Sequence, residues 1–370
     1  MFKALAALFA VASAGGALAA GPAAGAGSDA PAKEPPRVLS VGTDGVLKIG
    51  VLLQGWYVYQ QVDAAGGSII SNTFRVRRAE INVQGDIVPD LIGYRMGFDP
   101  SRLFEPVDTV VPVTGPGGGT VTVKQFPGAG SIFQDLFVTL KTPYADVSVG
   151  QLLIPVSLEG YGPSEALLLP ERALVASAYG DKRDLGIRAS KAFKYWSYTA
   201  GVFNGAGANG LDNDDSKDLA LRLEAYPIDG LTLGAVGYAS IGNRLSASTK
   251  DRWELDARYL KGPFTAQGEY IRARDGGGAS EVDSHGFYGE IAYKITDAFQ
   301  PAVRVGYLDP NLARDLDPTV DNSDEAWEFN AGVNYYLKGL QAKMQLGYTR
   351  IQYDVKAPVN QVILGTQVWF

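Results

Sequence analysis

The stretch DRWELDARYL, residues 251–260, decides the fold class of this chain. Its apolar residues at 253, 255, 257 and 259 alternate with charged residues at 252, 254, 256 and 258. Because successive side chains of a strand point to opposite faces, a strand here carries all these charges on one face. A packed protein core does not accept such a face, whereas a strand with lipid on one side and water on the other does.

The same alternation recurs as far as the last residue, where Leu364, Val368 and Phe370 share a parity opposite to that of Gln367. The pattern predicts about sixteen strands with one apolar face each. They lie near 46–60, 74–86, 90–99, 131–142, 145–153, 184–191, 193–204, 217–226, 230–241, 251–261, 263–273, 285–295, 299–308, 326–337, 340–353 and 360–370. Short and long connections alternate between them, as expected for periplasmic turns and extracellular loops. We therefore predict an all-β fold, a transmembrane antiparallel β-barrel, in preference to a soluble β-sandwich.

Composition excludes several kinds of site. The 370 residues include no cysteine and one histidine, so disulfides and thiolate zinc sites are impossible. The formal charge of 33 − 40 = −7 argues against nucleic-acid binding. The single histidine, His285, directly follows Ser284, so the two side chains should point to opposite faces of a strand and not form a catalytic pair. The acidic stretch 212–218 lacks the spacing of a calcium loop, and we expect no cofactor.

The first nineteen residues have the features of a secretory signal peptide. Lys3 precedes an apolar stretch at 4–12, and Ala17-Leu18-Ala19 is a cleavage signal. Residues 20–45 are predicted to form a flexible leader, which is rich in Ala, Gly and Pro at 20–37, and the barrel should occupy 46–370. No later stretch approaches the roughly 18 consecutive apolar residues that a transmembrane helix needs.

Residues 154–183 form a predicted loop that is too apolar for a solvated connection of its length. A barrel of sixteen strands is too wide for side chains to fill, so an aqueous channel remains unless a loop narrows it. We predict that this loop folds inward, with a helical turn near 164–177, and constricts the channel. Capping of the barrel and contact with a neighbouring subunit are the alternatives.

Several short motifs occur in an order and spacing that are typical of one family. They are FRVRRAE at 74–80, VGQLLIPVSLE at 149–159, PERAL at 170–174, GVFNG at 201–205 with DSKD at 215–218, and NYYL at 334–337. Over nearly the whole predicted mature chain, the sequence resembles the phosphate-selective porin O and P family. The resemblance implies a sixteen-stranded, usually trimeric channel in the outer membrane of a Gram-negative bacterium.

The resemblance and the lumen parity together predict a set of pore-lining or selectivity residues: Arg77, Arg78, Arg172, Arg188, Arg222 and Arg258. The first two match family positions that help to build an anion path, the third lies in the constriction loop, and the others have lumen parity. Lumen-facing carboxylates match the lumen-facing arginines in number, and Leu153 stands where many family members have lysine. This charge balance does not predict strong selectivity for either sign, and Leu153 departs from the pattern of a phosphate-specific channel. The sequence predicts a passive channel for small hydrophilic solutes, and the family positions at Arg77 and Arg78 add the hypothesis of a preference for anions such as phosphate.

A barrel enzyme or an adhesin without a conductive pore is the alternative function. The expected partners are the lipid bilayer, lipopolysaccharide, the permeating solutes or anions, and two further copies in a homotrimer. Phe370 ends the last strand, and a terminal aromatic residue is what this class of barrel presents to the outer-membrane assembly machinery.

Overall fold

The computed structural model describes residues 38–41, 45–64, 66–104, 107–113, 119–125, 129–212, 215–242, 249–276, 281–313 and 325–370. The predicted signal peptide, 1–19, lies outside the described residues, as do 20–37 and 42–44 of the predicted leader. No helix in the described part of the chain is long and apolar enough to cross a membrane.

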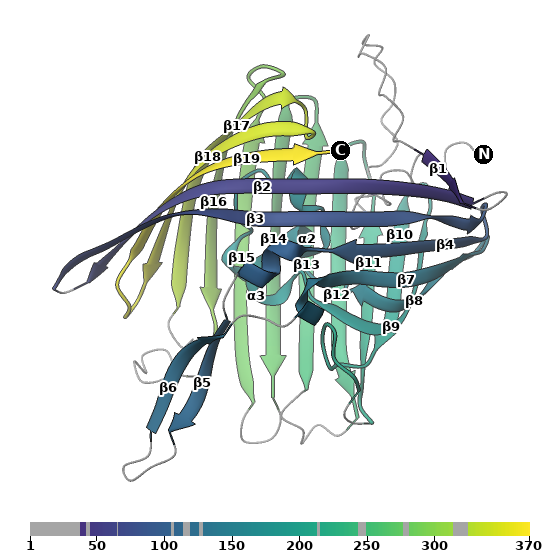
Figure 1. Ribbon diagram of the computed structural model, residues 1–370, viewed down its shortest axis with the longest axis horizontal. Helices are drawn as coiled ribbons and strands as arrows, with labels where there is room; N and C mark the ends of the chain where they lie inside the picture. Colours follow the sequence, from purple (N-terminus) through teal and green to yellow (C-terminus); the bar gives the residue numbers. More distant parts are fainter. Residues whose placement is uncertain are drawn as a thin grey trace.

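Sixteen antiparallel strands close into a barrel (Figure 1), which confirms the predicted fold class. The sheet has 17 strands, of which β1 (Val38–Val41) pairs only with the start of β2, so 17 − 1 = 16 strands form the ring. Strand β19 pairs with β2, and β9 pairs with β10, which closes the ring. The barrel strands are β2 (Gly45–Ala64), β3 (Gly67–Val88), β4 (Ile92–Phe98), β7 (Phe133–Lys141), β8 (Asp146–Leu153), β9 (Arg183–Ala192), β10 (Trp196–Phe203), β11 (Lys217–Ala225), β12 (Leu231–Ile241), β13 (Lys250–Lys261), β14 (Phe264–Asp275), β15 (Val282–Tyr293), β16 (Phe299–Asp309), β17 (Ala326–Lys338), β18 (Ala342–Tyr353) and β19 (Val359–Trp369).

The two faces of the strands alternate as the sequence predicts. In β13, Trp253 and Leu255 are 46% and 58% exposed on the outside, whereas Glu254 and Asp256 are 1% and 6% exposed on the inside. Outward apolar side chains are stable in lipid, because hydrocarbon chains are as apolar as the side chains themselves. Aromatic rings gather on this outer face near the strand ends, as between Trp253 and Tyr270, whose ring centres lie 5.1 Å apart. Such belts mark the membrane interfaces.

Two strands are longer than predicted. Strands β2 and β3 have 20 and 22 residues and continue as a ribbon past β4 (Figure 1), while β19 stays paired with β2 as far as Val62. The neighbouring β4 has 7 residues and pairs with β3 only from Ile81 onward. Apolar alternation marks only the part of a strand that faces lipid, so the sequence pattern ended where the membrane-facing part ends. The predicted long connection at 100–130 contains a separate hairpin of β5 (Val107–Val113) and β6 (Gly119–Gln125).

Candidate channel constriction

Residues 154–182, which join β8 to β9, fold into the interior of the barrel, as predicted. The segment contains two short helices, α2 (Leu158–Tyr161) and α3 (Leu174–Tyr179), with a 3-10 turn (Ser164–Ala166) between them. Helix α3 packs on the inner wall, where Val175 contacts a cluster with Ile271 and Tyr288. The segment stays buried because its apolar side chains, which a solvated loop could not hold, lie against this wall.

Lumen-facing glycines allow the segment to approach the wall closely. A Cβ atom at Gly332 would lie 2.8 Å from Leu169 Cδ2, and one at Gly347 would lie 2.8 Å from Pro170 Cγ. Both distances are shorter than packed carbon atoms accept, so only glycine leaves room for the loop here. The absence of side chains at these two glycines therefore determines where the middle of the loop lies.

Wall carboxylates bind the beginning of the loop through its backbone. The backbone N–H of Ser157 donates to Glu254 Oε2 at 2.6 Å, and the Ser157 hydroxyl donates to Glu269 Oε1 at 2.8 Å. The backbone N–H of Leu158 donates to the other oxygen of Glu269. These three hydrogen bonds to two wall carboxyl groups fix the entry of the loop against β13 and β14.

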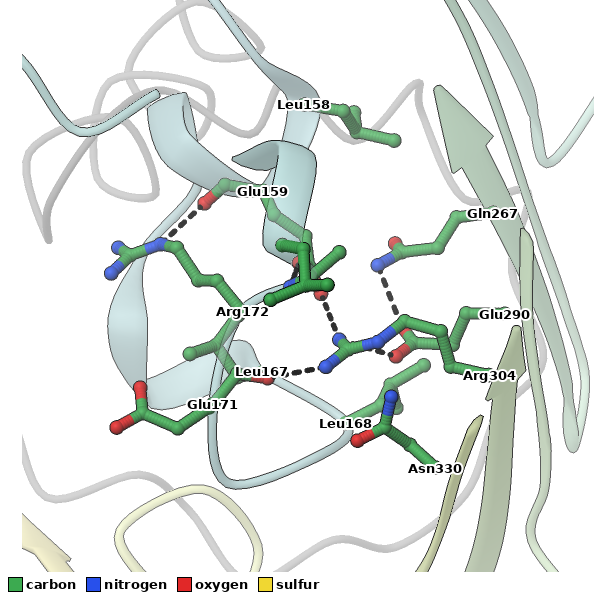
Figure 2. A network of polar contacts seen from close by, with 12 residues as sticks. Leu158, Glu159, Leu167, Leu168, Glu171, Arg172, Gln267, Glu290, Arg304 and Asn330 are labelled. Atoms are coloured by element: carbon green, nitrogen blue, oxygen red, sulfur yellow. Dashed lines mark hydrogen bonds and ion pairs between the residues drawn. The ribbon is translucent and has the colours of Figure 1, made fainter. Parts of the chain in front are cut away.

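Arg304 on β16 ties the loop to the wall at a second place (Figure 2). Its Nη1 lies 3.3 Å from Glu159 Oε1 and 3.3 Å from Glu290 Oε2. Its Nη2 donates to the carbonyl of Glu171 at 2.9 Å and lies 3.7 Å from Glu328 Oε2. The guanidinium is buried and shared by loop and wall, so it holds two turns of the loop at once.

Donors on β17 and β18, further along the same wall, bind loop carbonyls. Lys343 Nζ donates to the carbonyls of Glu165 and Leu167, each at 2.9 Å. Asn334 Nδ2 donates to the carbonyl of Leu168 at 2.8 Å, and Lys343 and Asn334 are 1% and 0% exposed. Strands β13 and β14 thus provide acceptors for loop N–H groups, and strands β17 and β18 provide donors for loop carbonyls.

The predicted site residues of β3 and of the loop lie close together. Arg77 makes a bidentate ion pair with Glu171, at 2.8 and 3.1 Å, and both side chains remain partly exposed. Arg78 is buried and donates to Gln54 at 2.7 Å. Arg172 is also buried, and its Nη1 lies 3.3 Å from Asp181 Oδ2.

Electrostatics in the loop follow from these pairs. Burial alone would raise the pKa of Asp181, but the guanidinium groups of Arg172 and Arg183 outweigh it and hold that pKa well below its ordinary value. Burial likewise opposes ionisation of Glu171, and Arg77 overcomes it and lowers the pKa of Glu171. Both loop carboxylates are therefore ionised at neutral pH, and each forms ion pairs with particular arginines.

The remaining predicted arginines lie elsewhere on the inner wall. Arg222 is 2% exposed and is surrounded by wall carboxylates, with its Nη2 2.8 Å from Asp256. Arg188 donates to the carbonyl of Leu153 at 3.1 Å, and Arg258 stays partly exposed. Arg222 therefore lies within a network of wall carboxylates, and its part in selectivity stays a prediction.

The residues weighed for catalysis or metal binding are used structurally. Ser284 points inward and accepts the hydroxyl of Tyr179 at 2.6 Å, whereas His285 points outward to Tyr270, 3.2 Å from its hydroxyl. No group of three or more metal-ligating side chains occurs among the described residues, although Asp214 lies outside them. Asp218 instead accepts the hydroxyl of Ser240 at 2.5 Å.

A comparison with known families decides the assignment. The family model described as Gram-negative porin matches residues 4–356. The chain belongs to this family. It forms an outer-membrane channel for small solutes, and this assignment points to a channel rather than an enzyme.

Solved structures share the fold of this porin at low sequence identity. The outer-membrane protein OmpT of Vibrio cholerae has a TM-score of 0.59 at 13% identity, covering 88% of this chain and 99% of that one. The outer-membrane channel DcaP of Acinetobacter baumannii has a TM-score of 0.59 at 11% identity, covering 90% and 99%. The anion-selective porin of Comamonas acidovorans has a TM-score of 0.57 at 14% identity, covering 88% and 100%. A comparison with curated protein sequences finds no match.

Proposed function

We propose that this porin is a diffusion channel for small hydrophilic solutes that prefers anions, phosphate among them. The observation that supports this preference is a group of cations at one end of the constriction loop. Lys182 ends the loop, Arg102 lies in the connection after β4, and Arg252 begins β13, all at the end of the barrel that carries the long connections.

These cations influence one another and face the lumen. Burial within the barrel mouth lowers the pKa of Lys182, and the nearby Arg102 and Arg252 lower it further, while Asp181 opposes them. The Arg102 side chain is 39% exposed, and Lys182 is exposed as well. The acid closest in sequence, Asp181, is held by Arg172 and Arg183. Arg252 lies 2.6 Å from Asp275 and Arg102 lies 3.8 Å from Asp99, so the exposed ammonium group of Lys182 is the charge that supports an anion preference here.

Replacement of Lys182 by glutamate is expected to move the reversal potential in a KCl gradient toward cation preference. The change reverses one charge in a narrow passage where screening by salt is weak. Lys261→Glu is the matched control, because Lys261 lies at the other end of β13, roughly 30 Å from Arg252 along the strand. Screening by salt acts over about 8 Å at physiological ionic strength. Equal reversal potentials for wild type and Lys182→Glu in planar bilayers would exclude this residue from the selectivity filter.

The proposal also includes the subfamily of this porin, its export by a signal peptide and its contact with lipopolysaccharide. Membership of the phosphate-selective porin O and P family is supported by the motifs at 74–80 and 149–159, and export by the signal peptide at 1–19. Contact with lipopolysaccharide by the long connections is part of the same proposal.

A homotrimer is supported by the short strands of one sector of the barrel. Strands β4, β7 and β8 have 7, 9 and 8 residues, at or below the roughly 9–11 that a transmembrane strand needs. A neighbouring subunit can cover this sector where lipid fits poorly. The V. cholerae protein OmpT is described in a trimer form. The mass of the detergent-purified porin by light scattering tests the trimer, and a monomeric mass would refute it.

Recognition by the assembly machinery through Phe370 gives a further prediction. Phe370 exchanges backbone hydrogen bonds of 3.1 and 2.8 Å with Val51, so it also pins the end of the last strand to the first. Deletion of Phe370 should lower the yield of heat-modifiable barrel in cell membranes more than Val362→Ala does, since the substitution at 362 leaves the backbone pairing of β19 intact. Equal yields from the two variants would count against a role of the terminal residue in assembly.

A further inference from the structure

A β-bulge at Arg77 changes which side chains of β3 reach the lumen. Gln54 on β2 pairs with Arg78, and the next residue, Gly55, pairs with Val76, so Arg77 is the extra residue of the bulge. In a regular strand, Arg77 and Arg78 would point to opposite faces. The bulge allows both to point inward, and bulges commonly re-aim side chains in this way at functional sites.

The bulge gathers three arginines around one point of the inner wall. The guanidinium carbons of Arg75 and Arg77 each lie 5.6 Å from the ring centre of Trp56, which is buried beneath them. Arg78 lies buried beside them on Gln54. The indole face holds two of the guanidinium planes in place by cation–π contact, which preorganises the cluster.

The Glu171 carboxylate occupies this cluster. Its Oε1 and Oε2 accept from Arg77 Nε and Nη2 at 2.8 and 3.1 Å, the fork geometry that a guanidinium offers to any carboxylate. Burial would raise the pKa of Glu171, yet Arg77, Arg78 and Arg75 lower it, so three arginines act on this single group. Its backbone is fixed by Arg304, and Figure 2 shows its carboxylate pointing away from Arg304.

We propose that Arg75, Arg77 and Arg78 form a binding site for the carboxylate group of permeating solutes, and that Glu171 is its built-in competing ligand. The proposal rests on the anion preference proposed above and names a substrate class for it. The Arg77 and Glu171 side chains are 22% and 32% exposed, so a solute can reach the pair from the lumen. A solute carboxylate would take the two donors of Arg77 while Glu171 turns into water. Because Glu171 returns when the solute leaves, binding stays weak enough for transit.

The test compares succinate and chloride in planar bilayers containing the purified porin. Glu171→Gln removes the competitor but keeps the size of the side chain. A partly exposed ion pair contributes about 0.2–1 kcal/mol, so the concentration of succinate that half-blocks chloride current should fall by about 1.4- to fivefold. Arg77→Gln should abolish the block, and Glu171→Gln should have no further effect in the Arg77→Gln background. Asp86→Asn is the matched control, since Asp86 makes a similarly exposed ion pair with Lys141 toward the end of β3, and its half-blocking concentration should equal that of wild type.

The outcomes separate this site from the general anion preference. If wild type prefers anions in a KCl gradient but Glu171→Gln leaves the succinate block unchanged, the carboxylate site is refuted and the anion channel stands. If phosphate blocks as strongly as succinate and responds equally to Glu171→Gln, the site is not specific for carboxylates and the proposal is overturned. If wild type prefers cations, the anion preference fails, whatever succinate does. Tighter succinate block in Glu171→Gln alone supports the competing-ligand model.

Discussion

Replacement of residues 164–177 by a short Gly–Ser linker is expected to raise the single-channel conductance of this porin several-fold. The segment holds the 3-10 turn and most of α3, which fill the interior of the barrel against β14 to β18. A sixteen-stranded barrel without an inward loop encloses a wide aqueous channel, and conductance rises with the open cross-section. Hydrogen bonds between neighbouring strands do not involve this segment, so the barrel should still assemble. Single-channel recording in KCl measures the change.

Deletion of the β5–β6 hairpin, residues 107–125, is the control for that experiment. Its strands pair only with each other in the described part of the chain, and Figure 1 shows the hairpin projecting from the barrel. Its loss should leave conductance close to that of wild type. A folded 164–177 variant with wild-type conductance would mean that the loop does not limit the flow of ions.

Arg304→Gln is expected to lower the free energy of unfolding more than Arg304→Lys or Arg274→Gln does. The substitution removes the only cation that contacts Glu159, Glu290 and Glu328 together among the described ion pairs, and it leaves three buried carboxylates facing one another. Breaking a buried charge network costs about 3–5 kcal/mol. The free energy of unfolding, followed in urea by tryptophan fluorescence, should fall by this amount, and current noise should increase as the loop loses its second attachment.

Arg274→Gln provides the matched comparison. Arg274 pairs with Asp283 and Glu281 at the exposed rim of the barrel, where ion pairs contribute little. Its unfolding midpoint should stay close to that of wild type. Arg304→Lys should recover only part of the loss, because an ammonium group lacks the planar fork that contacts both loop and wall. Similar midpoints for Arg304→Gln and Arg274→Gln would refute the anchoring role of Arg304.

The strands could be predicted from sequence because each one shows its lipid face and its water face in its own alternation of residues. Each strand faces lipid on one side and water on the other, so the parity of residues such as Leu255 and Glu254 reveals the two faces without any knowledge of the neighbours. The extension of β3 was missed, since residues 67–73, GSIISNT, do not alternate apolar and polar residues. The bulge at Arg77 was missed for a related reason: one inserted residue changes the pairing with Gln54 and Gly55 but leaves no mark in composition.

The loop's inward direction could be predicted, but its attachments could not. The apolar residues of 154–183 show that the loop must be buried, whereas its wall partners come from strands far along the chain. Glu269, Glu328, Lys343 and Asn334 all have lumen parity in the sequence, yet parity does not show which strand faces which loop carbonyl. Lumen parity likewise did not show that Glu254, which lies 3.3 Å from Arg222, would accept the backbone N–H of Ser157 and so hold the loop.

The seam between β2 and β19 determines when this protein can fold. Gln54 and Gln367, which bond across it at 2.8 Å, are 313 residues apart in the chain. Gln367 also donates to the carbonyl of Glu165 at 3.3 Å, so docking of the loop waits for the same last strand. Closure is therefore impossible until β19 has been synthesised and exported, and the edge of β2 stays open until then. Contacts this distant form slowly, so the exported chain must be protected from aggregation until β19 has crossed the inner membrane.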